Sequence, residues 1–173
     1  GSIRPGNYIG LHFFSPAEEV PLVEIVRGAP TSDETVARAF DFVRAIQKIP
    51  IVVKDDWGFY AARVQNTFIL EGITMLSEGY PPALIENLGL QAGMPIGALS
   101  LADKLGLNMV LRYENQAAEH YGTKYIQHPA VGVLKAMLEE HQRPGQQKRA
   151  GFYAYQAEQA AGLWEGLSEA FPP

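Results

Sequence analysis

The first part of the chain consists of short apolar runs with one amphipathic segment between them. Residues 8–14 and 20–26 are apolar runs of strand length, each ended by a turn that contains proline or glycine, and residues 51–53 form a third run of β-branched side chains. Between the second and the third run, apolar residues recur at helical spacing from Val36 to Ile46. The pattern therefore predicts the order strand, strand, helix, strand.

The predicted helix has a start signal and a stop signal. Thr31-Ser32-Asp33-Glu34 has the T-x-x-E form of a capping box, and its two acids lie in the first turn, where the helix dipole favours negative charge. Pro50 stops the helical spacing because proline cannot continue a helix. We therefore expect the helix to begin at the box that opens with Thr31.

After about residue 54, helical patterns replace strand patterns. A turn at residues 55–58 precedes a long segment, 59–78, which lacks proline and has apolar residues on almost every side, as a buried helix does. Further helical stretches, separated by glycine or proline, are predicted at about 82–92, 96–105, 107–121 and 130–140. The predicted fold class is therefore mainly α, with the last edge of an α/β unit followed by an all-helical bundle.

Composition and charge narrow the class of protein. The 173 residues include 14 Lys and Arg against 19 Asp and Glu, a net charge of −5, and 47% are hydrophobic, which is typical of a globular protein. No run of basic residues occurs, so nucleic-acid binding is not expected. The sequence has no cysteine, which fits a reducing compartment, and no apolar run of membrane-spanning length. We therefore expect a cytoplasmic protein without a membrane span.

His12 and Glu24 are the first candidates for chemistry, because they lie on the two consecutive predicted strands. A strand period of two gives Glu24 apolar neighbours on its own face, so a buried carboxylate there would need a partner, and His12 is a candidate. A carboxylate that binds one imidazole nitrogen leaves the other free to act as a general base towards an alcohol. The alternative is a structural role, with His12 satisfied in the core and Glu24 exposed at a strand edge.

Other kinds of site have little support in the sequence. His120, His128 and His141 lack H-E-x-x-H spacing, so no metal site is expected, and solvated helix ends explain these residues better. The sequence contains no G-x-G-x-x-G or G-x-x-x-x-G-K-[ST] string for a nucleotide. It also contains no G-x-S-x-G string of a nucleophile-elbow hydrolase.

Two blocks of sequence, Ile9–Pro16 with His12 and Pro21–Gly28 with Glu24, resemble the 3-hydroxyacyl-CoA dehydrogenase family. The resemblance covers about residues 4–155, and the ordered series of blocks is far more specific than any one of them. Later blocks follow in the family's order: Thr31–Thr35, Pro50–Asp55, Gly58–Tyr60, Glu78–Gly79, Ala92–Gly97 and Gly151–Tyr155.

The resemblance implies a truncated NAD-binding Rossmann-like domain at residues 1–57 and a helical C-terminal domain at residues 58–173, with acyl-CoA bound between them. The family's glycine-rich NAD loop precedes the histidine block. Gly1-Ser2 is similar to a cloning scar, and the chain lacks an initiating methionine. The chain is therefore expected to be an excised piece of a longer enzyme and to be inactive alone.

The resemblance also implies roles for individual residues. His12 would take the proton of the 3-hydroxyl group of (3S)-3-hydroxyacyl-CoA while hydride passes to NAD, and Glu24 would stabilise the resulting imidazolium. Ser15 stands where many members have an asparagine near the nicotinamide, so a cofactor contact is expected there. The implied activity is a dehydrogenase step of fatty-acid β-oxidation, in a polypeptide similar to the multifunctional enzymes.

Ala62 is the clearest departure from the family pattern, because members commonly have a substrate-positioning asparagine at this position. Alanine cannot form that hydrogen bond. Two other interpretations therefore stay open: a degenerate homologue without catalysis, and an association module built on the helical part. The family resemblance also implies a homodimer, or packing against a second helical domain.

Overall fold

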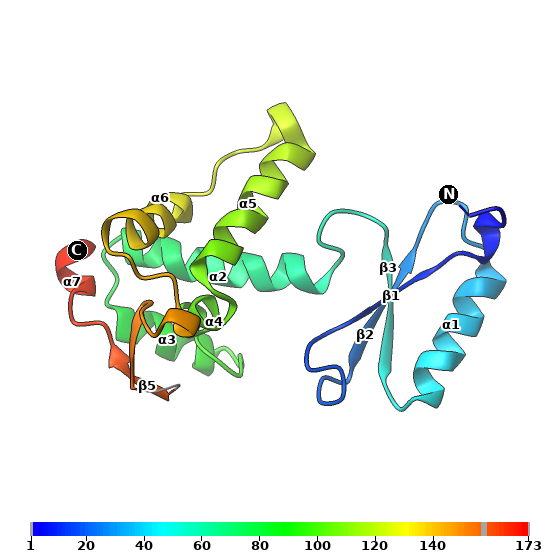
Figure 1. Ribbon diagram of the computed structural model, residues 1–173, viewed down its shortest axis with the longest axis horizontal. Helices are drawn as coiled ribbons and strands as arrows, with labels where there is room; N and C mark the ends of the chain where they lie inside the picture. Colours follow the sequence, from blue (N-terminus) through cyan, green and yellow to red (C-terminus); the bar gives the residue numbers. More distant parts are fainter. Residues whose placement is uncertain (1, 157–158, 173) are drawn as a thin grey trace. The chain divides into compact units, whose positions relative to one another are not determined.

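The computed structural model describes residues 2–156 and 159–172 of the chain (Figure 1). Contacts along the chain divide it into two compact units, Gly1–Val64 and Gln65–Pro173. Helix α2 (Ala61–Ser77) contributes residues to both units. The candidate catalytic pair lies in the first unit.

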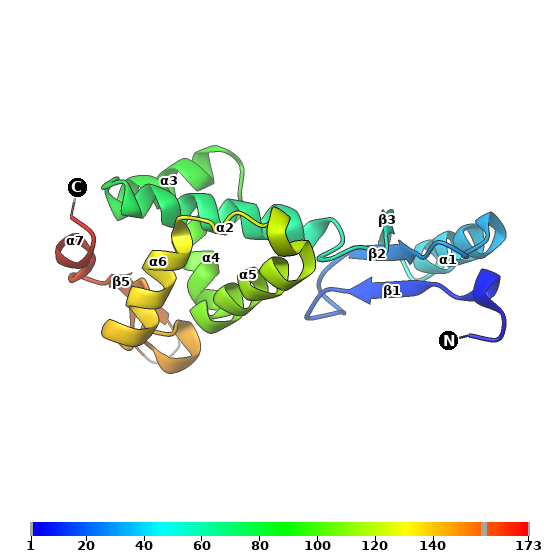
Figure 2. The same cartoon turned by 90° about the horizontal axis from the view of Figure 1, so that it is seen from above.

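The first unit is a three-stranded sheet with one helix against it. The strands are β1 (Gly10–Phe13), β2 (Leu22–Arg27) and β3 (Ile49–Lys54), in that spatial order, and helix α1 (Asp33–Ala45) connects β2 to β3. Strand β2 runs antiparallel to β1 and parallel to β3, as a crossover through a helix allows. Figure 2 shows α1 beside the sheet. The predicted order strand, strand, helix, strand is confirmed.

The central strand β2 is buried on both of its faces. Val23 and Ile25 pack with Ala39 and Val43 of α1, so this face and the apolar stripe of the helix form a small core. Alternation along the strand places Glu24 on the opposite face, away from α1. The sheet thus has one structural face and one face that carries a buried acid.

The interpretation of Thr31 as the helix cap is wrong by one residue. Ser32 is the N-cap of α1, and its Oγ accepts a hydrogen bond from the Thr35 backbone N–H at 3.2 Å. Thr31 is buried, and its hydroxyl donates instead to the Tyr8 carbonyl at 2.8 Å. Because the Thr31 hydroxyl is engaged with Tyr8, it is not available to cap the helix. Serine is an equally good N-cap residue, so Ser32 takes this role.

The second unit contains helices around one apolar core. The helices of the second part are α2 (Ala61–Ser77), α3 (Pro82–Gln91), α4 (Ala98–Leu105), α5 (Leu107–Tyr121), α6 (Ala130–Lys135) with a π-helical turn at Ala136–Glu140, and α7 (Leu167–Ala170). Short 3₁₀ turns lie at Pro5–Asn7 in the first unit and at Gly122–Lys124 and Gln146–Lys148 in the second. The core is formed by Ile69, Ile73, Leu99, Leu134 and Phe152, with further aliphatic side chains around them.

The prediction of an all-helical second part is wrong. Strands β4 (Tyr153–Gln156) and β5 (Gln159–Leu163) form an antiparallel pair with an irregularity between Ala154 and Tyr155. Two strands of four and five residues give too short an alternation to be recognised in the sequence. Both units of the chain therefore contain a sheet.

A buried acid, Asp103, holds the start of this hairpin. Its carboxylate accepts hydrogen bonds from the backbone N–H groups of Phe152 and Tyr153 and from the Tyr155 hydroxyl, each at 2.8 Å. Gly151 is required beside it, because a Cβ atom there would overlap the Asp103 carboxylate. Asp103 therefore joins α4 to the hairpin through bonds that span about 50 residues of sequence.

A second buried acid, Glu86 of α3, caps the start of α4. Its Oε1 accepts from the Leu99 N–H at 2.8 Å, and its Oε2 accepts from the Tyr153 hydroxyl at 2.7 Å. Free N–H groups at a helix start favour a negative partner of this kind. Gly97 precedes α4 because a Cβ atom there would overlap the Glu86 carboxylate. The two acids give the second unit a hydrogen-bonded frame.

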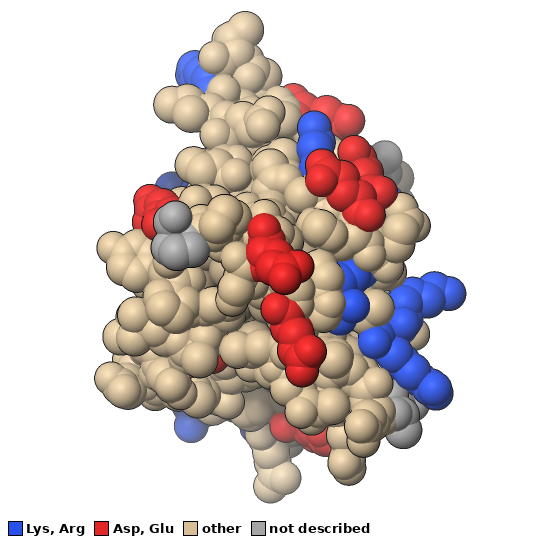
Figure 3. Space-filling model, turned by 90° about the vertical axis from the view of Figure 1, so that its left-hand side faces the viewer, with Lys and Arg blue, Asp and Glu red and all other residues tan. Residues whose placement is uncertain are grey.

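The charged surface is mixed. On the face that Figure 3 shows, acidic side chains occupy the centre and the upper part, basic side chains gather towards the right-hand edge, and most of the surface is uncharged. Such a face lacks the broad basic area that binding to nucleic acid uses. Among the described residues, no helix has the length and apolar character needed to cross a membrane.

Candidate active site

The structure brings His12 and Glu24 together. The two residues are direct partners in the β1–β2 register, and His12 Nδ1 lies 2.7 Å from Glu24 Oε2. The Glu24 side chain is completely buried, whereas 39% of the His12 side chain is exposed. The alternative of an exposed glutamate at a strand edge is wrong, because Glu24 lies on the central strand of the sheet.

The other oxygen of Glu24 is held by the start of helix α2. Glu24 Oε1 accepts from the backbone N–H groups of Tyr60 at 3.0 Å and Ala61 at 2.8 Å. Burial alone would raise the pKa of Glu24, but the hydrogen bonds from Ala61, His12 and Tyr60 together outweigh it, and the pKa is lowered from its ordinary value of 4.5. Glu24 is therefore ionised at neutral pH.

The ionised carboxylate determines which nitrogen of His12 carries the proton in the neutral ring. A carboxylate can only accept, so the nitrogen that faces it, Nδ1, is assigned as the donor. The other nitrogen, Nε2, then carries the lone pair and can take a proton from a bound molecule. The imidazolium formed in this way would be stabilised by the adjacent negative charge.

We expect replacement of Glu24 by glutamine to lower the free energy of unfolding at pH 7 by about 1–3 kcal/mol, because a buried, charge-assisted set of hydrogen bonds is lost. The folded-state pKa of Glu24 is lowered, so the stabilisation by the carboxylate is complete above pH 4.5 and is lost as the pH falls through the folded value. Urea unfolding at pH 7, 5, 4 and 3.5 measures the difference between the two proteins.

Glu34 of α1 provides the control for this measurement, since its side chain is 75% exposed and pairs across the helix surface with Arg38. Glu34→Gln is expected to change stability by less than about 0.5 kcal/mol. A difference between Glu24→Gln and the wild type that is the same at every pH would contradict the assigned ionisation of Glu24.

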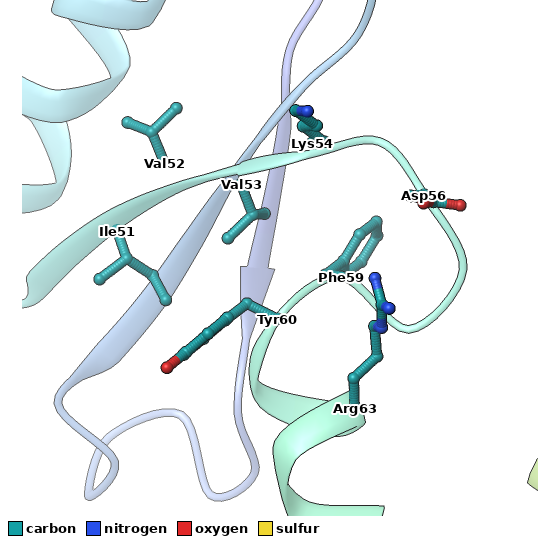
Figure 4. A pocket seen from close by; sticks show the side chains of 8 residues that line it. All are labelled: Ile51, Val52, Val53, Lys54, Asp56, Phe59, Tyr60 and Arg63. Carbon is teal, nitrogen blue, oxygen red and sulfur yellow. The ribbon is translucent and has the colours of Figure 1, made fainter.

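A pocket of about 530 Å³ lies in the same unit, and two of its lining residues, Phe59 and Tyr60, also contact the pair. Figure 4 shows Ile51 and Val53 of β3 pointing towards the side of the strand where Tyr60 lies, with Val52 on the other side and the Arg63 side chain directed towards the Phe59 ring. The pocket is lined by Ile51, Val52, Val53, Lys54, Asp56, Phe59, Tyr60 and Arg63. Its wall is therefore mainly apolar and aromatic, with charged groups from β3, the following turn and α2.

Several site residues could not be found by motif reasoning. The N–H groups of Tyr60 and Ala61 come from backbone and leave no trace in side-chain patterns. The rings of Phe14 and Phe59 contact the His12 ring, with centroids 4.7 and 5.7 Å away. Phe14 and Phe59 lie in the blocks Ile9–Pro16 and Gly58–Tyr60 that resemble the family, but these blocks do not show that the two rings contact His12.

Two residues with expected roles, Ser15 and Ala62, lie in the same unit as the pair. Ser15 is exposed and follows β1 by two residues, and Ala62 is half-buried at the second position of α2. Ala62 offers only a methyl group, although the adjacent Ala61 N–H is bound to Glu24. The roles expected for both residues stay predictions.

The remaining histidines have different surroundings. His128 and His141 lie at helix ends and are half-buried, and each has a neighbour: His128 Nε2 lies 3.4 Å from Glu71, and the His141 ring contacts Trp164. His120 lies in the exposed last turn of α5, as expected. Within residues 2–156 and 159–172, no cluster of three or more histidine or acidic side chains could hold a metal ion.

Two family models match the chain. The model described as "3-hydroxyacyl-CoA dehydrogenase, NAD binding domain" matches residues 2–56, and that described as "3-hydroxyacyl-CoA dehydrogenase, C-terminal domain" matches residues 58–155. The fold and the buried histidine–glutamate pair agree with these matches. The chain belongs to the 3-hydroxyacyl-CoA dehydrogenase family, with a Rossmann-like fold that combines helices and a sheet.

Individual relatives support the same family. The fatty acid oxidation complex subunit alpha of Vibrio cholerae is 35% identical over 152 residues, and that of Shewanella oneidensis is 34% identical over 154 residues; these alignments include 88% and 89% of this chain. Among solved structures, (S)-3-hydroxybutyryl-CoA dehydrogenase from Ralstonia eutropha has a TM-score of 0.79 and 32% identity over 90% of this chain. The chain spans 21% of the length of the two complex subunits and 54% of the Ralstonia chain.

Proposed function

We propose that this chain supplies the general base of an NAD-dependent dehydrogenase that oxidises (3S)-3-hydroxyacyl-CoA to 3-ketoacyl-CoA in fatty-acid oxidation. The observation that carries the proposal is the 2.7 Å contact between a half-exposed imidazole and a fully buried carboxylate. The names of the relatives, a fatty acid oxidation complex subunit and a 3-hydroxybutyryl-CoA dehydrogenase, support the same substrate class.

In the proposed reaction, His12 Nε2 takes the proton of the 3-hydroxyl group. The O–H electron pair forms the C3=O bond, and the C3–H bond breaks with both electrons. NAD, when bound, accepts that hydride. Glu24 keeps its negative charge through the step and stabilises the imidazolium that His12 becomes. In the reverse direction the imidazolium returns the proton to the ketone oxygen.

Residues that fit NAD are only partly present in this sequence. The first unit has the strand that carries His12, and Ser15 after it is proposed to contact the nicotinamide. No G-x-G-x-x-G string occurs in the chain, so none of its residues is assigned to the pyrophosphate. The proposed activity therefore needs a glycine-rich loop from sequence outside these 173 residues.

The test is an assay of NADH consumption with acetoacetyl-CoA. A longer protein that includes the upstream glycine-rich loop is expected to turn over, while the 173-residue chain alone is expected to be inactive. Turnover would also exclude the degenerate homologue suggested by Ala62, because the missing asparagine would then be dispensable. A folded, NAD-binding longer protein without turnover would overturn the proposed function in favour of that homologue.

The proposed organisation is the end of an NAD-binding domain at residues 1–57 and a mainly helical C-terminal domain at residues 58–173. The matches of the two family models, to residues 2–56 and 58–155, support this division. A cytoplasmic location is part of the same proposal and is supported by the absence of cysteine, which fits a reducing compartment.

We further propose that the helical part associates, either with a second copy or with another helical domain. Helix α3 exposes 41% of Leu84 and of Leu88 and 50% of Leu90, an apolar surface that association would cover. Sedimentation of the chain is expected to show a dimer whose fraction falls when Leu84 and Leu88 are both replaced by serine. A strict monomer at high concentration would contradict self-association.

A further inference from the structure

The hydrogen bond to Glu24 fixes only one point of the His12 ring. Nδ1 is held at 2.7 Å from the carboxylate, but the ring can still turn about the line of that bond. A proton acceptor works only when its lone pair points at the reacting hydroxyl group. The plane of a ring that is 39% exposed must therefore be held by further contacts.

Two aromatic rings provide such contacts. The Phe14 ring lies 4.7 Å from the His12 ring at an angle of 55°, and the Phe59 ring lies 5.7 Å away at 53°. Phe14 is two residues from His12 and directly follows the end of β1. Phe59 comes from a segment 47 residues later, so its position is set independently of β1.

The backbone at Phe59 has a conformation that side chains rarely adopt. Gly58 has φ of 69° and Phe59 has φ of 47°, so two successive residues lie in the left-handed region. Such strain in a bulky residue is kept where the surrounding structure demands it, often at functional sites. The next two N–H groups, of Tyr60 and Ala61, bind Glu24. One short segment thus contacts both members of the pair.

Phe59 also borders the open pocket described above. It lines that 530 Å³ space together with Ile51, Val53 and Tyr60, so part of the ring faces space and not a packed core (Figure 4). Close packing therefore does not enclose the ring on every side. The left-handed backbone, held by the Phe59 N–H bond to the Asp56 carbonyl at 3.2 Å, keeps the ring against His12.

We propose that Phe59 is a positioning residue for the general base. Its ring holds the plane of the His12 imidazole, while the backbone that follows it holds the Glu24 carboxylate. This inference rests on the proposed role of His12 as the base. Removing the ring would leave the 2.7 Å bond possible but would let the imidazole turn away from the reactive orientation.

The first test uses the 173-residue chain and nuclear magnetic resonance, and needs no activity. In the wild type we expect nuclear Overhauser contacts between the Phe59 and His12 rings, and nitrogen shifts typical of a single tautomer with the proton on Nδ1. In Phe59→Ala the two nitrogen shifts should move towards each other, and the His12 contact to Phe14 should weaken. Phe59→Leu, which refills the space, should restore the wild-type pattern.

Phe42→Ala is the matched control, because Phe42 is a half-exposed phenylalanine on α1 outside the site. It should leave the His12 signals unchanged. Absence of the Phe59–His12 contact in the wild type would overturn the inference, whether or not Phe59→Ala folds. Unchanged nitrogen shifts in a folded Phe59→Ala variant would overturn it as well.

The second test uses the longer protein with the glycine-rich loop. Phe59→Ala is expected to lower kcat about tenfold with KM changed less than about twofold, and Phe59→Leu to stay within about threefold of the wild type. If His12→Gln abolishes turnover but Phe59→Ala does not reduce it, the inference fails and the proposed function stands. If the wild type has no turnover, the proposed function fails, and the resonance test still decides whether Phe59 orients the ring.

Discussion

Replacing His12 by glutamine in a protein that includes the glycine-rich loop is expected to lower kcat by about 10²–10⁴, the usual contribution of a general base. Glutamine has a similar reach but no nitrogen lone pair able to accept the proton at neutral pH. KM for acetoacetyl-CoA should change little, because the lost interaction belongs to proton transfer and not to binding. Steady-state consumption of NADH measures both constants.

The structure offers a control histidine for this experiment. His120 lies in the exposed last turn of α5, outside the unit that contains the pair, so His120→Gln should retain the wild-type rate. The His12 side chain is 39% exposed, so its replacement should leave the fold intact, which thermal unfolding can verify. Wild-type turnover in His12→Gln would remove His12 from the mechanism.

Replacing Asp103 by alanine is expected to destabilise the protein by about 3–5 kcal/mol at pH 5. The buried N–H groups of Phe152 and Tyr153 and the Tyr155 hydroxyl would lose their acceptor, and unsatisfied buried donors are costly. The hairpin β4–β5 should also detach from α4, because Asp103 holds its first residues. Guanidinium unfolding followed by circular dichroism measures the loss.

The effect of the Asp103 replacement should depend on pH in a defined direction. Burial raises the pKa of Asp103 to about 6, against the hydrogen bonds from Tyr153, Phe152 and Tyr155 that lower it. A raised folded-state pKa gives stability that is complete below the unfolded value of 3.8 and is lost as the pH rises through about 6. The wild type should therefore gain about 1 kcal/mol over Asp103→Ala between pH 7 and pH 5.

Asp41 on the exposed side of α1 is a suitable control, and Asp41→Ala should have neither effect. A folded Asp103→Ala variant as stable as the wild type at pH 5 would show that the hairpin is held by packing alone. An Asp103→Ala penalty that stays the same from pH 5 to pH 7 would show that the pKa of Asp103 is not raised to about 6.

The elements that could be predicted from the sequence are those determined by interactions between residues close together in the chain. The three strands and α1 were predictable because apolar runs and helical spacing report burial within a few residues. Two consecutive strands made a contact between His12 and Glu24 possible, since an antiparallel pair brings their side chains to one face, but spacing alone also allowed a structural role for both. The blocks around both residues, which resemble the family, indicated the role of a general base and its partner, which spacing alone did not decide.

The interactions that could not be predicted join distant residues. The N–H groups of Tyr60 and Ala61 meet Glu24 across 36 and 37 positions, and Asp103 meets the hairpin across 49 and 50. No local pattern encodes such a meeting, because backbone donors are the same in every residue except proline. The N-cap of α1 is Ser32 and not Thr31 for a similar reason: the Thr31 hydroxyl is bound to the carbonyl of Tyr8, 23 positions away.

The double use of Glu24 has an evolutionary consequence. One carboxylate anchors the first turn of α2 and also faces the imidazole, so a descendant that lost its chemistry would still need the acid for folding. His12 is partly exposed and holds no other element in place, so in such a descendant it could be replaced by other residues without loss of the fold. Among divergent relatives, a retained glutamate at this position is therefore weak evidence that catalytic activity has been kept. A retained histidine is strong evidence of it.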